Sequence, residues 1–171
     1  MFTGLARSVR ANLNLSSPLS QKQKLVWSLV CKGLPVIAIA GTLKTTRQFV
    51  NQTKLAAEAK LSATLLDVAQ ANHIHVTRLD SKEGVLLGYH PGLKRRAIIT
   101  YSVKHGIKVW YWYDKPEEVT DREFLNQTRA YLLDIASERG VKVEGAKTMH
   151  PAKLAHLLFS ELIPEVEART P

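Results

Sequence analysis

The sequence has a single cysteine, Cys31, among its 171 residues. One thiol cannot form a disulfide within the chain, and it cannot supply a zinc site built from several cysteines. Cys31 lies in an apolar stretch, where a free cysteine usually serves as a small buried hydrophobic side chain. Neither an internal disulfide nor cysteine-based metal chemistry is therefore predicted.

Acidic residues are absent from the first third of the chain. Residues 1–57 contain no Asp or Glu and eight basic side chains, whereas residues 58–171 contain 16 basic and 15 acidic ones. The net charge of +9 thus belongs almost wholly to the N-terminal third. A nucleic-acid-binding domain usually carries its basic residues on the folded body, so this distribution favours a targeting segment or contact with anionic lipid. The eight are Arg7, Arg10, Lys22, Lys24, Lys32, Lys44, Arg47 and Lys54.

The segment VIAIAGTLKTT (36–46) lacks the second glycine of a phosphate-binding loop. A Walker A loop needs glycine directly before its Lys-Ser/Thr pair, because backbone N–H groups must turn inward onto the phosphate. Leu43 stands at that position before Lys44, and its Cβ blocks the required backbone angles. A nucleotide-hydrolysing enzyme is therefore not predicted.

Residues 25–43 are mainly apolar and contain one charge, Lys32. About 20 such residues suffice to cross a bilayer. A central lysine costs about 2.5–3.5 kcal/mol, while each Leu, Ile or Val returns about 0.3–0.6 kcal/mol. We therefore expect a candidate transmembrane helix over 25–43. The alternative is a helix over 20–32 that ends at Gly33, with Pro35 beyond it and a buried strand over 36–40.

The flanks of this stretch complete the expected organisation of the chain. Residues 1–24 form a basic arm or targeting segment, and the arginine- and serine-containing, acid-free composition of its first 19 residues is typical of an organellar transit peptide. Residues 44–171 form an α+β domain. Its first element is a helix over 46–71, which lacks Gly and Pro. The predicted apolar positions of that helix are Phe49, Thr53, Ala56, Ala59, Ala63 and Leu66.

The period of the sequence then changes to two, which indicates strands. Four segments rich in β-branched and aromatic residues are separated by short polar turns, so an antiparallel meander is expected. The predicted strands are 73–79, 84–90, 94–103 and 107–114.

Two helices and a short strand follow the meander. The pattern Thr120-x-x-Glu123 predicts a capping box at the start of a helix over 121–139. A short fifth strand is expected over 141–145, and Pro151 opens a last helix. We predict an α+β fold in which the helices cover one face of the sheet.

His73 and His75 are the first candidate site, because alternate residues of a strand share a face. Two imidazoles do not define a metal site, which also needs a further ligand such as His90, His105 or Asp80. The strands 94–103 and 107–113 contain no carboxylate for metal-dependent phosphodiester cleavage. We therefore expect no catalytic, cofactor or metal site.

An aromatic and basic hairpin is the second candidate, as a protein interface or a nucleic-acid contact. Two tryptophans alternate on one strand, and a basic cluster begins its neighbour. Aromatic rings beside cations stack on single-stranded bases, whereas the other interpretation is that one aromatic face is core and the other meets a helix or a partner. The residues are Lys94, Arg95, Arg96, Trp110 and Trp112.

These observations favour a non-enzymatic, membrane-anchored accessory subunit or assembly factor of a larger membrane protein complex. Its expected partners are other protein subunits and an anionic lipid membrane, either a mitochondrial inner membrane or a bacterial cytoplasmic membrane. The alternative is a soluble, cytoplasmic nucleic-acid-binding protein whose basic arm contacts phosphate and whose hairpin over 94–113 stacks on bases.

Overall fold

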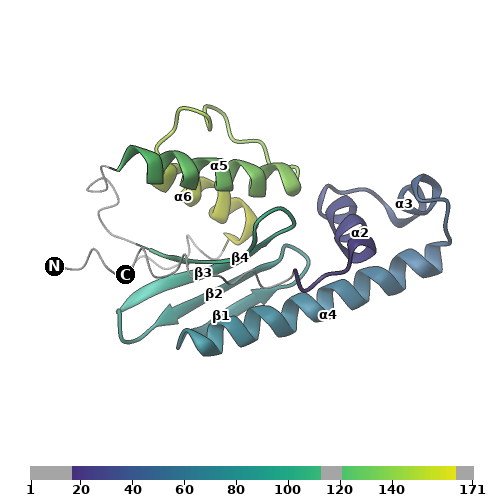
Figure 1. Ribbon diagram of the computed structural model, residues 1–171, viewed down its shortest axis with the longest axis horizontal. Coiled ribbons are helices and arrows are strands. Elements are labelled where there is room, and N and C mark those ends of the chain that lie inside the picture. Colours follow the sequence, from purple (N-terminus) through teal and green to yellow (C-terminus); the bar gives the residue numbers. More distant parts are fainter. Residues whose placement is uncertain (1–16, 113–120, 165–171) are drawn as a thin grey trace.

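A four-stranded antiparallel sheet lies between a long helix, α4, and a helix pair, α5 and α6, in the computed structural model of the chain (Figure 1). The structure describes residues 17–112 and 121–164. The helices are α2 (Gln21–Cys31), α3 (Val36–Thr42), α4 (Arg47–Ala71), α5 (Arg122–Glu138) and α6 (Pro151–Leu162). The strands are β1 (His75–Asp80), β2 (Val85–His90), β3 (Arg95–Ser102) and β4 (Gly106–Tyr111). The predicted α+β class is confirmed.

The sheet is the predicted meander, with strand order β1-β2-β3-β4. Each strand pairs antiparallel with the next, and a bulge between Val76 and Arg78 interrupts the pairing of β1 with β2. Gly88 is required where β1 approaches β2, because a Cβ there would lie 2.4 Å from Ile74 Cγ2 and 2.6 Å from the His75 carbonyl oxygen. All four strands overlap the segments that the alternating sequence pattern predicted.

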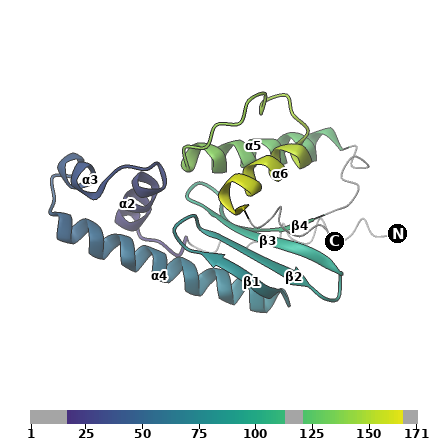
Figure 2. The ribbon, with the colours of Figure 1, turned by 180° about the vertical axis from the view of Figure 1, so that it is seen from behind.

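Helices cover both faces of the sheet, whereas one covered face was expected. On one face, Leu87 and Ile98 pack with residues of α5 and α6 such as Leu132 and Leu158. On the other face, Leu86 and Ile99 pack with Leu65 and Ala69 of α4. Figure 2 shows the same layers from behind, with α4 on the side of the sheet opposite to α5 and α6. The expectation failed because β2 and β3 are apolar at successive positions, and such strands are buried on both faces.

The buried side of α4 is not the side that the sequence pattern indicated. Its buried residues are Val50, Ala57, Leu61, Leu65 and Ala69. The predicted apolar positions lie elsewhere on the helix, and all but Thr53 are exposed. Because α4 has apolar or small residues on two sides, periodicity alone did not identify the side that faces the sheet.

Residues 25–43 form two helices, so the expected single membrane-spanning helix is unsupported. α2 ends at Cys31, and Gly33 follows with φ of +81°, a backbone angle that favours glycine. Pro35 then precedes α3 and lacks the N–H that would continue α2. In the described ranges 17–112 and 121–164, no helix is both long enough and apolar enough to cross a bilayer.

The alternative for the same stretch is correct in its first half only. The helix expected over 20–32 is α2, and a capping box of Ser20 and Gln23 starts it. The strand expected over 36–40 is helical instead, because Ile39 and Ala40 of α3 pack against α2 and α4. A short apolar run is compatible with either structure, and packing decides between them.

The C-terminal part also departs from the expected elements. Asp121 caps α5, with its side chain accepting hydrogen bonds from the N–H groups of Glu123 and Phe124. The predicted cap Thr120, residues 113–114 of the fourth predicted strand and residues 1–16 of the expected arm lie outside the described residues. The short strand expected over 141–145 is a turn-containing connection to α6, which begins at Pro151 as predicted.

Candidate functional site

The basic lobe consists of residues 17–57, which form α2, α3 and the start of α4. Figure 1 shows α2 and α3 beside the end of α4 that extends beyond the sheet. Val26, Ile39, Ala40 and Val50 are its buried core. Trp27 attaches the lobe to the sheet, with its ring 5.2 Å from that of Tyr101 and edge-to-face with it.

All Asp, Glu, Lys and Arg positions of the basic lobe are occupied by lysine or arginine, so the lobe is positively charged. Its sequence has no Asp or Glu and six basic residues, of which Lys22, Lys32, Lys44 and Arg47 are exposed. The first carboxylate of the chain, that of Glu58, lies just beyond the lobe and is 3.9 Å from Lys54 Nζ. The exposed cations therefore lack acidic neighbours in their own segment, and the lobe presents a positive surface.

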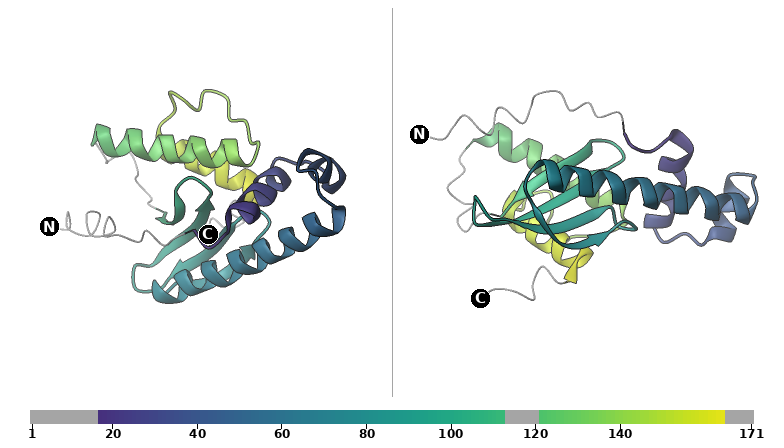
Figure 3. Two further views of the ribbon diagram at one scale, coloured as in Figure 1. Left: turned by 45° about the vertical axis from the view of Figure 1, so that its right-hand side comes forward. Right: turned by 90° about the horizontal axis from the view of Figure 1, so that it is seen from below.

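The outer end of the basic lobe is apolar. α3 lies at the end of the molecule remote from the sheet, as the two views of Figure 3 also show. Ile37 is 64% exposed, although isoleucine is usually buried, while Ile39 on the opposite side of α3 fills the lobe core. Lys32 and Lys44 flank α3 in the sequence and are exposed. This end combines an exposed apolar side chain with cations.

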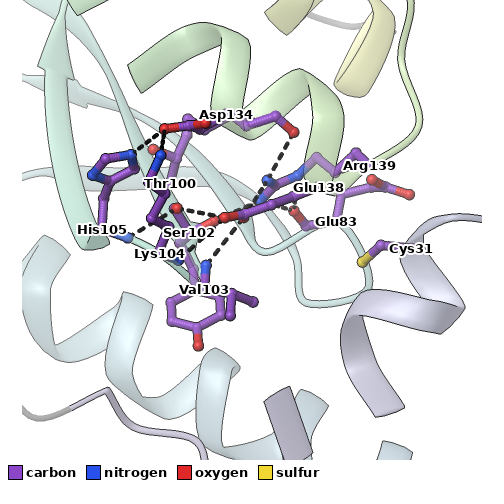
Figure 4. Close-up of polar contacts among 12 residues, drawn as sticks. Cys31, Glu83, Thr100, Ser102, Val103, Lys104, His105, Asp134, Glu138 and Arg139 are labelled. Carbon is purple, nitrogen blue, oxygen red and sulfur yellow. Dashed lines mark hydrogen bonds and ion pairs between the residues drawn. The ribbon is translucent and has the colours of Figure 1, made fainter. Parts of the chain in front are cut away.

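A polar cluster joins the β3–β4 hairpin to α5, and Figure 4 shows its residues. The carboxylate of Glu138 accepts hydrogen bonds from Ser102 Oγ at 2.8 Å, the Val103 N–H at 3.0 Å and the Lys104 N–H at 3.2 Å. The carboxylate thereby pairs two backbone N–H groups of the hairpin turn that would otherwise lie unpaired against a helix. Glu138 therefore fixes the hairpin on α5.

Arg139 donates hydrogen bonds to buried backbone carbonyl groups, as Glu138 accepts them from backbone N–H groups. Its buried guanidinium donates from Nε and Nη2 to the Glu83 carbonyl oxygen, at 2.9 and 2.6 Å, and from Nη2 to the Tyr101 carbonyl oxygen at 2.7 Å. It also stacks 5.4 Å from the centre of the Trp27 ring. Burial lowers the pKa of Arg139, and nearby carboxylates oppose that effect. The side chain links α5 to the β1–β2 turn, β3 and the basic lobe.

Asp134 binds two side chains of the hairpin, Lys104 and His105, at the exposed side of the polar cluster. Its Oδ2 lies 2.8 Å from Lys104 Nζ and 2.6 Å from His105 Nε2. These hydrogen bonds lower the pKa of Asp134. An aspartate–histidine pair also occurs in hydrolases, where the other ring nitrogen serves a nucleophile. Here the hydroxyl of Ser102 is already engaged, since it donates to the Glu138 carboxylate and accepts from the backbone N–H of His105. The geometry is that of a structural attachment.

Lys108 lies over two aromatic rings beside this cluster. Its Nζ is 4.4 Å from the centre of the Trp110 ring and 4.5 Å from that of Tyr131. Burial lowers the pKa of Lys108 and raises that of Tyr131 to about 12. The position of the Lys108 ammonium over the two ring faces is the geometry of a cation–π interaction.

The structure separates the residues of the predicted aromatic and basic hairpin. Trp110 packs under α5 and α6, with its ring 5.2 Å from Tyr131 and 6.0 Å from Phe159, and its Nε1 donates to Thr100 Oγ1. Trp112 is half-buried against His156 of α6. In the nucleic-acid interpretation this ring would stack on bases, but core side chains occupy it, in agreement with the other interpretation.

The basic members of that hairpin lie at the end of the sheet where β3, an inner strand, begins. Lys94 is exposed in the β2–β3 turn with φ of +50°. Arg95 donates from Nη1 to the Trp112 carbonyl oxygen at 3.3 Å, and Arg96 is half-buried on β3. They do not form one exposed surface with Trp110.

The histidine pair is not assembled into a metal site. His73 ends the turn after α4 with φ of +54°, whereas His75 begins β1. His90 accepts from the Leu93 N–H, and His105 is bound to Asp134. Within the described part of the chain, no group of three or more His, Cys, Asp or Glu side chains has the arrangement of a metal site.

The polar cluster was not identified from the sequence. Glu138 and Arg139 stand at the end of a predicted helix, where charged residues are common and need no special role. Their spacing to Ser102 or Glu83 carries no pattern, since the contacts join distant segments. No family model, no curated protein and no solved structure matches this chain.

Proposed function

We propose that this chain is a non-enzymatic accessory subunit or assembly factor of a membrane protein complex, and that its basic lobe rests on an anionic lipid surface. The observation that carries the proposal is that the outer end of the basic lobe combines an exposed apolar side chain with basic residues. Ile37, an exposed apolar residue of α3, stands in the sequence between the exposed Lys32 and Lys44, in a segment without acidic residues. Peripheral membrane proteins bind by this combination of apolar burial and attraction to anionic headgroups.

The polar cluster supports a structural rather than a catalytic role for the rest of the molecule. Ser102, His105 and Asp134 already have partners within the fold. Their hydrogen bonds hold the hairpin on α5, which suits a rigid domain that presents surfaces to other subunits. We therefore assign the layered α+β body to protein contacts and the basic lobe to the membrane.

Vesicle flotation with the full chain tests the proposal. We expect binding to vesicles of mixed zwitterionic and anionic lipid, weak binding to purely zwitterionic vesicles, and release as the salt concentration rises. The triple variant K32E/K44E/R47E should bind more weakly by at least about 3 kcal/mol, or more than about 100-fold, since each basic residue near an anionic surface contributes about 1 kcal/mol and each glutamate adds repulsion.

A matched variant separates a local contact from a general effect of charge. K142E/K147E/K153E makes the same change of charge at exposed lysines of the α5–α6 connection and α6. It should retain most of the binding. Equal losses in the two triple variants, or equal binding to zwitterionic and anionic vesicles, would refute the lobe assignment.

The unmodified chain and the two triple variants also distinguish membrane binding from the alternative function, nucleic-acid binding. Titration with single-stranded and duplex nucleic acid at several salt concentrations measures phosphate contacts directly. A steep salt dependence with nucleic acid, together with no vesicle binding, would replace the membrane proposal by the nucleic-acid one. The packing of Trp110 beneath α5 and α6 argues against base stacking by this ring, on which the nucleic-acid alternative relied.

A further inference from the structure

A second face of α4, away from its buried residues, is exposed and carries a regular pattern. Its two ends lie beside other elements: Lys22 Nζ of α2 is 5.9 Å from the centre of the Phe49 ring, and Leu66 and Gln70 line a hollow with residues of β1. Seven exposed residues recur at alternating intervals of three and four. We call this set the α4 seam, and its residues are Phe49, Gln52, Ala56, Ala59, Ala63, Leu66 and Gln70. Its large apolar members are accessible, with Phe49 38% and Leu66 43% exposed, and the adjacent Leu55 is 63% exposed.

The α4 seam has the spacing of a helix-pairing surface. Intervals of three and four residues give the 3.5-residue repeat with which one helix packs along another. Alanines in the middle would allow close approach of a partner helix, and Phe49 and Leu66 would supply larger contacts at the ends. The right-hand view of Figure 3 shows α4 in front of the other helices and the sheet along its length. A partner helix therefore has room to lie along it.

We propose that the α4 seam binds the same seam of a second copy of this chain, with the two helices antiparallel. In this arrangement Phe49 of each copy meets Leu66 of the other, and Ala56 meets Ala59. The proposal does not depend on the lipid contact of the basic lobe, because the seam lies on a different face from the exposed side of α3.

Charge selects this orientation. The first turn of α4 contains Arg47 and no acidic residue, whereas Asp67 is exposed near the other end of the helix. Antiparallel pairing brings Asp67 of each copy to the positive N-terminal end of the partner's α4, where a carboxylate is favourable. Parallel pairing would align the two helix dipoles and leave both Asp67 carboxylates beside the negative helix ends.

Sedimentation of the full chain over a range of concentrations tests the dimer. The unmodified chain should pass from monomer to dimer, and A59E should raise the dimer dissociation constant by a factor of about 100 or more, because it buries an unpaired carboxylate from each copy. A130E places the same side chain at an exposed alanine of α5 and should leave the dimer intact. Circular dichroism shows whether each variant retains its fold.

Disulfide trapping tests the orientation. Residues 49 and 66 lie about 25 Å apart along the helix, from its rise of about 1.5 Å per residue. Antiparallel pairing therefore predicts a cross-linked product when the F49C and L66C proteins are mixed, and little from either alone. Parallel pairing predicts the reverse. A chain that stays monomeric at every concentration, or that cross-links only like with like, overturns the proposal.

Discussion

Replacement of Arg139 by methionine removes a side chain that joins α5 to the β1–β2 turn, β3 and the basic lobe. The guanidinium donates to the carbonyl oxygens of Glu83 and Tyr101 and stacks on Trp27. Methionine keeps much of the length and apolar area but donates no hydrogen bond. The variant therefore isolates the polar contribution of Arg139.

The expected cost follows from the two carbonyl groups that lose their donor. Each buried and unpaired polar group costs about 1–3 kcal/mol, and hydrogen bonds from a charged donor are at the strong end of the range. Relief of the buried charge offsets part of this loss. We expect the free energy of unfolding to fall by about 3–5 kcal/mol, a large part of the roughly 5–15 kcal/mol of a typical domain.

Urea and thermal unfolding, followed by circular dichroism, measure this effect. R139K should lose most of the same stability, because one ammonium cannot reproduce the two-sided contacts of the planar guanidinium. R122M removes an exposed arginine at the start of α5 and should change stability by less than about 0.5 kcal/mol. A loss below about 1 kcal/mol for R139M would refute the role assigned to Arg139.

Two further predictions concern titrating groups. Asp134 has a lowered pKa because Lys104 and His105 hydrogen-bond to it, so it stabilises the fold above the ordinary pKa of aspartate and the effect is lost as the pH falls through the lowered value. D134N should be less stable than the unmodified chain at neutral pH and equally stable in strong acid, and a constant difference across that range would contradict the assignment. Burial raises the pKa of Cys31 to about 12, and its Sγ lies 3.2 Å from the Lys82 carbonyl oxygen. A thiol reagent at pH 8 should thus modify it slowly in the native chain and rapidly in denaturant, and rapid native labelling would contradict this.

Local patterns predicted the strands and most of the helices, because they report on turns and caps. Alternation placed the four strands, and Pro151 marked the start of α6. Gly33 and Pro35 are ordinary stop signals that end α2. The long apolar stretch 25–43 nevertheless led to the prediction of one continuous transmembrane helix. The helical α3 was missed because its structure depends on packing against α2 and α4.

Contacts between distant segments could not be predicted from local sequence patterns. For Trp110 the sequence left two interpretations open, an open face that stacks on bases or a core face, and the ring lies under α5 and α6. The role of Glu138 depends on a hairpin turn more than 30 residues before it. For the basic lobe, by contrast, the absence of acidic residues was visible at once, and the structure added the exposed position of Ile37.

The position of α3 on a membrane is the most direct test of the proposed function. A cysteine introduced at residue 37 and labelled with an environment-sensitive fluorophore reports whether this site enters lipid. Cys31 is also present, and its expected slow reaction keeps the label specific. The matched site is residue 157, where an exposed leucine lies on α6. The account predicts a blue shift of the fluorophore at residue 37 on anionic vesicles and none at residue 157. No shift at residue 37, or an equal shift at both sites, would contradict it.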